Sequence, residues 1–307
     1  MITQSIKRLM DLNYNIDVRK IELFREGGNL SYIVYGVVKA FFAKIIRTPF
    51  LETALHSIEV QIYLMRKQFP VIPIIFTKTG SSCVHYTENN IDYLIILFEY
   101  IPGDEPSPRD TEKAGELVGR LHQTMKSYSG SLSVKGKEFF IDRYVNIMEE
   151  VNYKKTDWFR EYGNELWEKV KNLPQGYCHC DLYRGNINKA MNNKMYVIDF
   201  DTSCIAFSLY DVALFCNDTD YFNFDIYGYE RTANRLAEFY VGYQKYYSLS
   251  QEELSAIYSL IAIYHFQLQA TMIELYGLNE NQIRFFDSQY KWLQQWEEQC
   301  GDSKRQE

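Results

Sequence analysis

The chain has 307 residues, 46% of them hydrophobic and 24% charged, so it is long enough for one large domain or for two lobes with separate apolar cores. Its formal net charge of −7 lacks the basic footprint of a nucleic-acid-binding protein, and no block of Lys and Arg predicts a membrane-surface helix. No apolar run approaches the roughly 20 residues of a membrane span, and the first residues, MITQSIKRLM, lack the apolar core of a signal peptide. We therefore expect a cytoplasmic protein without a nucleic-acid or membrane partner.

The first hundred residues are predicted to be rich in β-structure with one helix. Three apolar or alternating runs within residues 21–47 are separated by EGGN and by a short turn near Val38, which predicts a meander of strands. An amphipathic helix is predicted next from apolar residues at three- and four-residue spacings, namely Leu55, Ile58, Ile62, Met65 and Phe69. The strand-like runs VIPIIF and YLIILFEY follow.

The clearest interruption in the chain is IPGDEPSPRD, which has three prolines and one glycine in ten residues. Beyond it the pattern becomes helical over 114–125, and residues 228–300 are almost entirely helical in pattern. We therefore expect an α+β fold with a small β-rich lobe over 1–98, a hinge over 99–104 and a larger helical lobe over 105–307.

The segment QGYCHCDLYRGNINKAMNNKMYVIDFD, which lies between these helices, carries the chemistry. GYCHC predicts a strand, LYRGN a loop, and NINKA with MYVID a hairpin around a polar turn, so that Asp181, Asn186 and Asp199 emerge close together from strand ends. These residue types suit phosphoryl transfer. One carboxylate can accept the proton of the attacking hydroxyl, while an amide oxygen and a second carboxylate hold Mg²⁺ against the phosphates of ATP.

The order and spacing of His179, Asp181 and Asn186 match the catalytic loop of kinases, in which the base follows the histidine by two positions and a metal-binding asparagine follows the base by five. Together, HCDLYRGNI, VIDFD and LYDVA resemble the aminoglycoside phosphotransferase and choline kinase superfamily, which are small-molecule kinases with a protein-kinase-like fold. The resemblance implies a two-lobe protein that uses ATP and Mg²⁺.

By the same resemblance, Asp181 is the catalytic base, and His179 shapes the loop through hydrogen bonds without transferring protons. Asn186 and Asp199 are the implied Mg²⁺ ligands. Asp201 is expected to support the metal site, and Asp211 is expected to brace the catalytic loop from the following helix. Members of the family usually have Gly where this chain has Cys180, and often His-Pro in place of Tyr183-Arg184. These departures leave the base and the metal ligands intact but leave the acceptor open.

A kinase also needs a phosphate-binding turn and a lysine in its first lobe. Gly27, Gly28 and Asn29 supply a turn whose backbone can approach phosphates closely, although a simple hairpin turn has the same sequence. Lys44, which has strand residues on both sides, is the candidate for the α- and β-phosphates, with a solvent-facing edge-strand lysine as the alternative. A buried ammonium needs a partner, and the first candidate is Glu59 on the predicted helix, followed by Glu52.

The segment LFEYIPGDEP resembles the hinge of the same superfamily, which implies that the backbone of Glu99, Tyr100 and Ile101 meets the adenine edge of ATP. An activation segment ending in Ala-Pro-Glu, which a protein kinase needs, is absent because no proline follows Pro174. We therefore expect a Mg²⁺- and ATP-dependent kinase that phosphorylates a hydroxyl of a small molecule.

The sequence leaves the acceptor open among aminoglycosides, choline or ethanolamine, homoserine and sugars. A cationic acceptor could bind the acidic residues Asp218, Asp220 and Asp225. The aromatic run at 221–229 could form a cage for a quaternary ammonium, or it could simply pack helix against helix, as we expect His265 to do. Arg184 could contact phosphate or extend along the loop surface.

Two classes without phosphoryl transfer also stay open, namely a structural relative such as a spore-coat protein and an ATP-dependent sensor. Neither the choice between ATP and GTP nor the oligomeric state follows from the sequence. The six cysteines form no C-x-x-C pair, and Cys178 and Cys180 lack a second ligand pair at zinc spacing, so neither a disulfide framework nor a zinc module is expected.

Overall fold

A computed structural model describes residues 2–27 and 29–303, and the chain forms two compact units. The first unit contains Met1–Glu105, Tyr128–Ser131 and Asn186–Thr202. The second contains Pro106–Ser127, Leu132–Gly185 and Ser203–Glu307. The first is β-rich and the second is larger and mostly helical, which is the α+β architecture expected from the sequence. The first segment of the first unit ends close to the predicted hinge. Residues 186–202, which the sequence places in the helical lobe, belong instead to the first unit.

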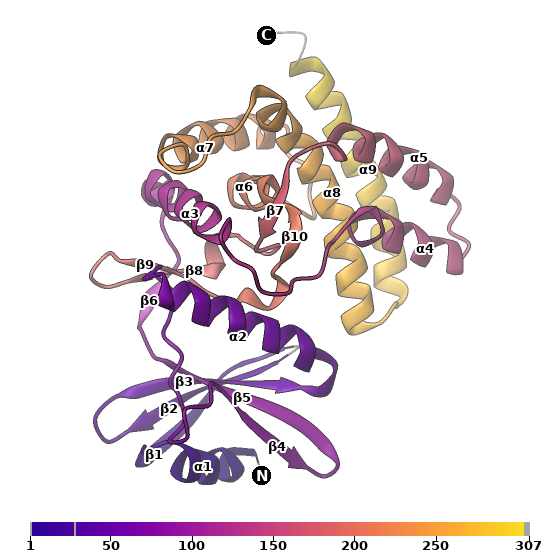
Figure 1. Ribbon diagram of the computed structural model, residues 1–307. Helices are drawn as coiled ribbons and strands as arrows, with labels where there is room; N and C mark the ends of the chain where they lie inside the picture. Colours follow the sequence, from indigo (N-terminus) through magenta and orange to yellow (C-terminus); the bar gives the residue numbers. More distant parts are fainter. Residues whose placement is uncertain (1, 28, 304–307) are drawn as a thin grey trace. The chain divides into compact units, whose positions relative to one another are not determined.

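A five-stranded antiparallel sheet forms the centre of the first unit, with the strand order β1-β2-β3-β5-β4 (Figure 1). The strands are β1 (Val18–Glu26), β2 (Leu30–Gly36), β3 (Ala40–Arg47), β4 (Val84–Glu88) and β5 (Ile91–Glu99). The predicted meander is confirmed as β1 to β3, whereas β4 was not predicted. The run VIPIIF, predicted as a strand, forms isolated bridges at Val71 and Ile74 in place of a regular strand, because Pro73 within the run cannot donate to a strand ladder.

Helices α1 (Ile2–Asn13) and α2 (Leu51–Arg66) cover opposite faces of this sheet (Figure 1). Ala43 and Ile45 of β3 share a buried core with α1, while Ile46 shares a second core with α2. Since side chains alternate along a strand, Lys44 projects from the face that α2 covers. The helix predicted over 55–69 is confirmed as α2, whereas α1 was not predicted, although it has apolar Ile6 and Met10 at helical spacing.

A smaller sheet explains why 186–202 belong to the first unit. It has the order β6-β8-β9, with β6 (Gly103–Asp104), β8 (Ile187–Ala190) and β9 (Met195–Val197). The predicted hairpin is confirmed as β8 and β9, and Gly103 pairs with Ala190. The chains approach so closely that a Cβ atom at Gly103 would lie 2.5 Å from the Lys189 carbonyl oxygen. Only glycine fits there without displacing the backbone.

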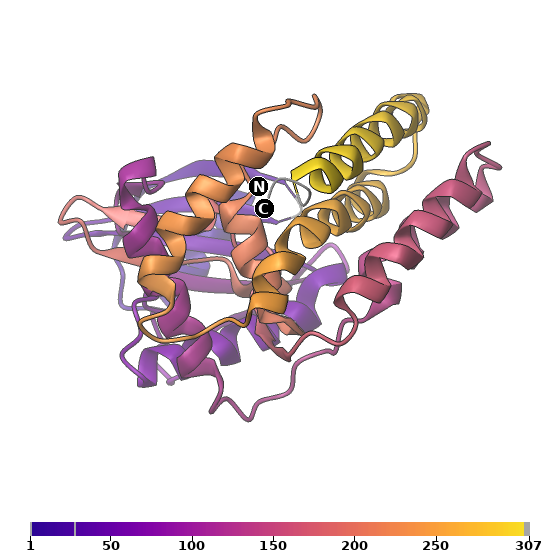
Figure 2. The ribbon, with the colours of Figure 1, turned by 90° about the horizontal axis from the view of Figure 1, so that it is seen from above.

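The second unit consists of helices around a two-stranded sheet. The helices are α3 (Thr111–Met125), α4 (Arg143–Glu150), α5 (Thr156–Val170), α6 (Ser208–Cys216), α7 (Gly228–Tyr243), α8 (Gln251–Tyr276) and α9 (Glu280–Ser303), and the strands are β7 (Gln175–Cys178) and β10 (Cys204–Phe207). Helices α8 and α9 lie side by side (Figures 1 and 2). The helical predictions over 114–125 and 228–300 are confirmed, and none of the described helices has the length and apolar character needed to cross a bilayer.

Helices α3 and α7 are in backbone contact. A Cβ atom at Gly115 would lie 2.0 Å from the Phe239 carbonyl oxygen, and one at Gly242 would lie 1.9 Å from the Glu112 carbonyl oxygen. Any larger residue at these positions would push the two helices apart. The close approach matters for the site because it brings a histidine of α3 against a tyrosine of α7.

Candidate active site

Predicted residues from three distant parts of the sequence meet in the first unit. The Lys44 ammonium nitrogen lies 2.7 Å from Asp199 Oδ1 and 2.6 Å from Asp201 Oδ2. Asn29, in the turn between β1 and β2, donates from Nδ2 to Asp201 Oδ2 at 3.3 Å. The strand lysine, the predicted phosphate-binding turn and the IDFD acids therefore form one polar cluster.

The pairing of Lys44 differs from the one expected. Burial lowers the pKa of Lys44, but the carboxylates of Asp199 and Asp201 raise it by more, so that the pKa ends above its ordinary value and Lys44 stays charged. Glu59 is exposed on α2, and the ion pairs of Lys44 in the described part of the chain are to Asp199 and Asp201, not to Glu59 or Glu52. The physical reason is that the 3₁₀ turn of Phe200–Thr202 packs against α2 and places Asp201 next to Lys44, whereas Glu59 is exposed to solvent.

A backbone hydrogen bond ties the two predicted metal ligands together. The N–H of Ile198 donates to the carbonyl of the buried Asn186 at 3.0 Å, so the start of the β8–β9 hairpin is bound to its end, directly before Asp199. Asp199 itself has φ of +62°, a left-handed conformation that costs a residue with a Cβ atom on the order of 1 kcal/mol or more. Such strain is typical of positions whose side chain must point in a set direction.

The donor set suits a divalent cation. Two carboxylates and an amide oxygen are hard oxygen ligands of the kind that Mg²⁺ prefers. The ammonium of Lys44 already lies against both carboxylates, which shows that Asp199 and Asp201 can share one positive charge. Asn186, Asp199 and Asp201 therefore fit the role of a metal-binding group.

Gly27, at the start of the predicted phosphate-binding turn, borders open space. The N–H of Gly27 donates to the carbonyl of Asn29 at 3.2 Å, and a Cβ atom at Gly27 would meet no other atom within 4 Å. A ligand could thus approach this backbone closely. Gly28 lies outside the described residues.

The hinge residues are partly engaged within the first unit. The N–H of Glu99 donates to the Pro73 carbonyl at 2.9 Å, and the Ile101 carbonyl accepts from Asn188 Nδ2 at 3.1 Å. A pocket beside the hinge has a volume of about 470 Å³ and is lined by Lys39, Ala40, Glu99, Tyr100 and Pro102. The contact of Glu99, Tyr100 and Ile101 with adenine stays a prediction.

In the second unit, Asp211 of α6 braces the catalytic loop, as predicted. This fully buried carboxylate accepts the backbone N–H of His179 at Oδ2, at 2.7 Å, and that of Cys180 at Oδ1, at 2.9 Å. His122 Nε2 lies 3.0 Å from Oδ2. Because a carboxylate only accepts hydrogen bonds, Nε2 carries the proton. The loop that bears Asp181 is therefore anchored through its backbone.

Burial alone would raise the pKa of Asp211, but His122 and the N–H of His179 lower it below its ordinary value, so the brace stays ionised. The other ring nitrogen of His122 lies 2.7 Å from the Tyr243 hydroxyl, across the α3–α7 contact. His122 was not among the residues predicted from the sequence. The pattern that could have indicated it is a histidine beside Leu121, on the apolar face of a predicted helix.

Cys180 occupies a backbone position that suits glycine. Its φ is +67°, in the left-handed region that glycine enters without cost. This explains why the resembled family usually has glycine at this position, directly before Asp181. Asp181 belongs to the second unit, whereas Asn186, five residues later in the chain, belongs to the first.

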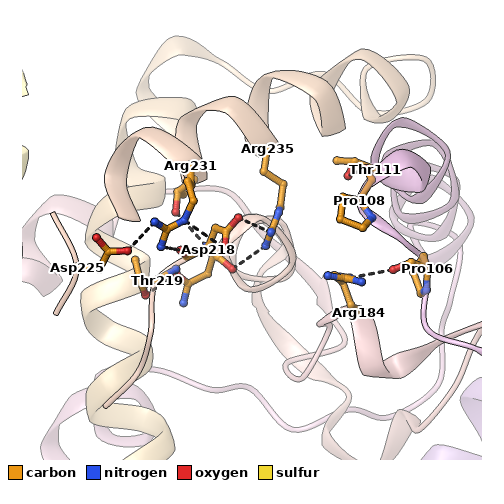
Figure 3. A network of polar contacts seen from close by, with 11 residues as sticks. Pro106, Pro108, Thr111, Arg184, Asp218, Thr219, Asp225, Arg231 and Arg235 are labelled. Atoms are coloured by element: carbon orange, nitrogen blue, oxygen red, sulfur yellow. Dashed lines mark hydrogen bonds and ion pairs between the residues drawn. The ribbon is translucent and has the colours of Figure 1, made fainter. Parts of the chain in front are cut away.

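The acidic residues considered for a cationic acceptor are largely neutralised within the second unit (Figure 3). Arg231 Nη1 lies 2.6 Å from Asp225 Oδ2, and Arg235 forms an ion pair with Asp218. Asp220 accepts two backbone N–H groups of the following loop. Two arginines balance two of the three acids, so these five residues leave a surplus of one negative charge.

The aromatic run at 221–229 packs against helices at Tyr221. Its ring stacks on His265, with centroids 4.6 Å apart, and its hydroxyl donates to Gln269. Phe222 and Tyr227 are exposed. His265 is completely buried and also contacts Trp292, which confirms the prediction that it belongs to the core. Arg184, the remaining candidate, donates from Nε to the Pro106 carbonyl at 2.9 Å (Figure 3).

The buried His265 should make stability depend on pH. Burial lowers its pKa to about 3, whereas the unfolded chain takes up this proton below a pKa of about 6.5, so stability is lost as the pH falls from there towards 3. The wild type should lose about 2 kcal/mol more unfolding free energy between pH 7 and pH 5 than His265→Phe does, as measured by urea denaturation. The exposed His85→Phe serves as control and should keep the wild-type dependence. Equal pH slopes for wild type and His265→Phe would contradict the prediction.

Comparison with known proteins gives three findings. Residues 21–258 match the phosphotransferase enzyme family. A homoserine kinase of Methylobacillus flagellatus is 30% identical over 156 residues, which are 46% of this chain and 48% of that protein, and the chain spans about half the length of the curated relatives that it matches. Among solved structures, an amicoumacin kinase in complex with AMP-PNP, Ca²⁺ and Ami has a TM-score of 0.72 at 16% identity, covering 96% of this chain and 93% of the other.

A microcompartment-associated aminopropanol kinase has a TM-score of 0.73, again at 16% identity, and the match covers 97% of this chain and 95% of the other. At such identities the likeness establishes the fold, which is the kinase-like α+β fold that the catalytic loop predicted.

Proposed function

Because the chain belongs to the phosphotransferase enzyme family, we propose that it moves the γ-phosphoryl group of ATP to a hydroxyl group of a small molecule. The observation that carries the proposal is the cluster in which Lys44 lies 2.7 Å from Asp199 and 2.6 Å from Asp201. Phosphoryl transfer needs a lysine for the nucleotide phosphates and acidic residues for the metal in one place. The cytoplasm, which supplies ATP and Mg²⁺, is the proposed compartment.

Asn186, Asp199 and Asp201 would hold Mg²⁺, and the ion would supply positive charge that offsets the negative charge of the phosphates. Lys44 would then bind the α- and β-phosphates, and the backbone at 27–29 would bind phosphate oxygens. The backbone of Glu99, Tyr100 and Ile101 would position the adenine.

Asp181 would orient the acceptor hydroxyl and take its proton as the oxygen attacks the γ-phosphorus. The role of His179 is structural, because Asp211 binds its backbone N–H and its side chain is fully buried. This division of roles leaves a single general base.

The similarity to curated relatives, and not the charge near α7, favours an amino acid as acceptor. The curated relatives are homoserine kinases, and a hydroxyl-bearing amino acid carries a carboxylate that a guanidinium can bind. The side chain of Arg231 is 41% exposed, although its guanidinium group already forms ion pairs with Asp218 and Asp225. Homoserine-type acceptors are therefore our first candidate, with amino alcohols and aminoglycosides as the alternatives.

The test is a transfer assay with Mg²⁺ and γ-labelled ATP against separate pools of hydroxyl amino acids, amino alcohols, aminoglycosides and sugars. We expect label in the pool that contains homoserine. Label in another pool would keep the phosphotransferase and change the acceptor. No label in any pool, together with a melting temperature that ATP and Mg²⁺ leave unchanged, would overturn the proposal in favour of a structural protein.

Replacing Lys44 by Met should lower kcat by at least about 100-fold, because the α- and β-phosphates, which gain negative charge as the γ-phosphoryl group leaves, lose a fixed cation. It also leaves Asp199 and Asp201 without the ammonium that they share. Steady-state kinetics at saturating ATP measures the effect. Lys20→Met is the matched control, because Lys20 is exposed on β1, where it forms an ion pair with Glu22 and lies over the ring of Tyr35. Wild-type turnover in Lys44→Met would exclude the assigned role.

A further inference from the structure

Three cysteine side chains that the proposed reaction does not use converge in the second unit. The Sγ atoms of Cys178, Cys180 and Cys204 all lie within 4.8 Å of one another, and all three residues are buried. Cys178 ends β7, Cys180 lies in the catalytic loop and Cys204 begins β10. No histidine or carboxylate of the described residues joins the three sulfurs at that separation.

The local backbone holds these sulfurs together. Strands β7 and β10 are antiparallel with Cys178 directly opposite Cys204, so both side chains project from the same face. Cys180 lies two residues beyond Cys178. Its backbone is left-handed, with φ of +67°, and its sulfur lies close to the other two. Asp211 in turn holds the Cys180 N–H at 2.9 Å. The fold itself therefore holds the three sulfurs close together.

Contacts among the thiols favour a thiolate. Hydrogen-bonding contacts with Cys178 and Cys180 lower the pKa of Cys204, and nearby Lys135 acts in the same direction. Burial raises the pKa of Cys178, whose Sγ donates to Asp211 Oδ1 at 3.3 Å. Thiolates are the form of cysteine that binds metals. A metal cation could therefore bind the Cys204 thiolate first and then displace the protons of the two neighbouring thiols.

We propose that Cys178, Cys180 and Cys204 form a binding site for one soft, closed-shell metal cation such as Zn²⁺, Cd²⁺ or Cu⁺. Thiolate sulfur is the ligand that these cations prefer. A Zn–S bond of about 2.3 Å requires sulfurs roughly 3.8 Å apart, so even the widest pair would need to close by only about 1 Å. Each thiol that binds the metal gives its proton to the buffer as the metal–sulfur bond forms.

The position of this site would couple it to the loop. Cys178 and Cys180 flank His179, and Asp181 follows directly. A cation bound to both cysteines would lock the backbone that presents Asp181. Metal binding itself is independent of the proposed phosphotransferase activity and can be measured without any substrate.

The first test is titration of the reduced, nucleotide-free protein with Cd²⁺, followed by the ultraviolet charge-transfer band of cadmium thiolates. We expect one equivalent of Cd²⁺ to saturate the wild type. Cys204→Ser should bind at least about 100-fold more weakly, since loss of a metal ligand costs no less than loss of an outer-shell partner. Cys216→Ser is the matched control, because Cys216 is an equally buried thiol on α6 outside the cluster, and it should bind like the wild type.

A second measurement does not depend on how the variants fold. X-ray absorption of the wild type loaded with one equivalent of Zn²⁺ should show three sulfur neighbours at about 2.3 Å. A shell of nitrogen and oxygen, the absence of a cadmium band, or equal Cd²⁺ affinity in the wild type and a folded Cys204→Ser variant would each overturn the proposal. The three cysteines would then be only small packing residues of the core.

Discussion

Asp181→Asn is expected to fold normally and to lose about three orders of magnitude in kcat. Asn has nearly the same size and keeps an acceptor oxygen, but it cannot take the proton that the acceptor hydroxyl must lose. The backbone on which residue 181 rests is held independently, through the bonds of His179 and Cys180 to Asp211. The substitution should therefore remove the base without moving the loop.

The measurement is kcat with the acceptor that the pool assay identifies, together with the melting temperature and its rise with ATP and Mg²⁺. Both thermal quantities should stay at the wild-type values, which separates loss of the base from loss of the fold. Asp157→Asn is the matched control, because Asp157 is 91% exposed on α5, and it should keep full activity. Turnover within a few-fold of the wild type in Asp181→Asn would mean that another group accepts the proton.

Asp211→Ala is expected to lower the free energy of unfolding by about 3–5 kcal/mol, because removing a buried carboxylate leaves the buried groups that donate to it without an acceptor. Three N–H groups lose their acceptor at once, namely His122 Nε2–H and the backbone N–H groups of His179 and Cys180, and the Cys178 thiol loses the Oδ1 atom that lies 3.3 Å away. All three are buried, so water cannot readily replace the carboxylate. The loop that carries Asp181 should lose its fixed position, and turnover should fall as well.

Denaturant unfolding of wild type and variant measures this loss. Asp142→Ala provides the control, because Asp142 pairs with Lys137 while both side chains are about one-third exposed, and partly exposed pairs contribute about 1 kcal/mol or less. Asp211→Asn keeps the volume of the side chain and tests how much of the loss comes from charge. A change below about 1 kcal/mol in Asp211→Ala would show that the carboxylate does not brace the loop.

Several features of the fold could be predicted because they depend on local patterns. The meander β1 to β3, the helix α2 and the hairpin β8–β9 follow from hydrophobic periodicity and turn residues within each segment. Helix α1 and strand β4 were missed. Strand β4 has only five residues, whereas α1 carries apolar Ile6 and Met10 at helical spacing, and both elements contribute to the same core, through Met10 and Val84.

The sequence by itself predicted the kinase-like chemistry, because His179, Asp181 and Asn186 lie within eight consecutive positions at the spacing of a kinase catalytic loop, and a strand ending in Asp199 follows. Only the tertiary structure decided which groups meet across the chain. Lys44 pairs with Asp199, 155 positions away, and not with the helix acid. Asp211 pairs with His122, 89 positions away, and Cys204 joins the two cysteines of the loop. The physical reason is that such contacts depend on strand register and helix packing, which arise from the whole core and leave no local pattern in the residues that they join.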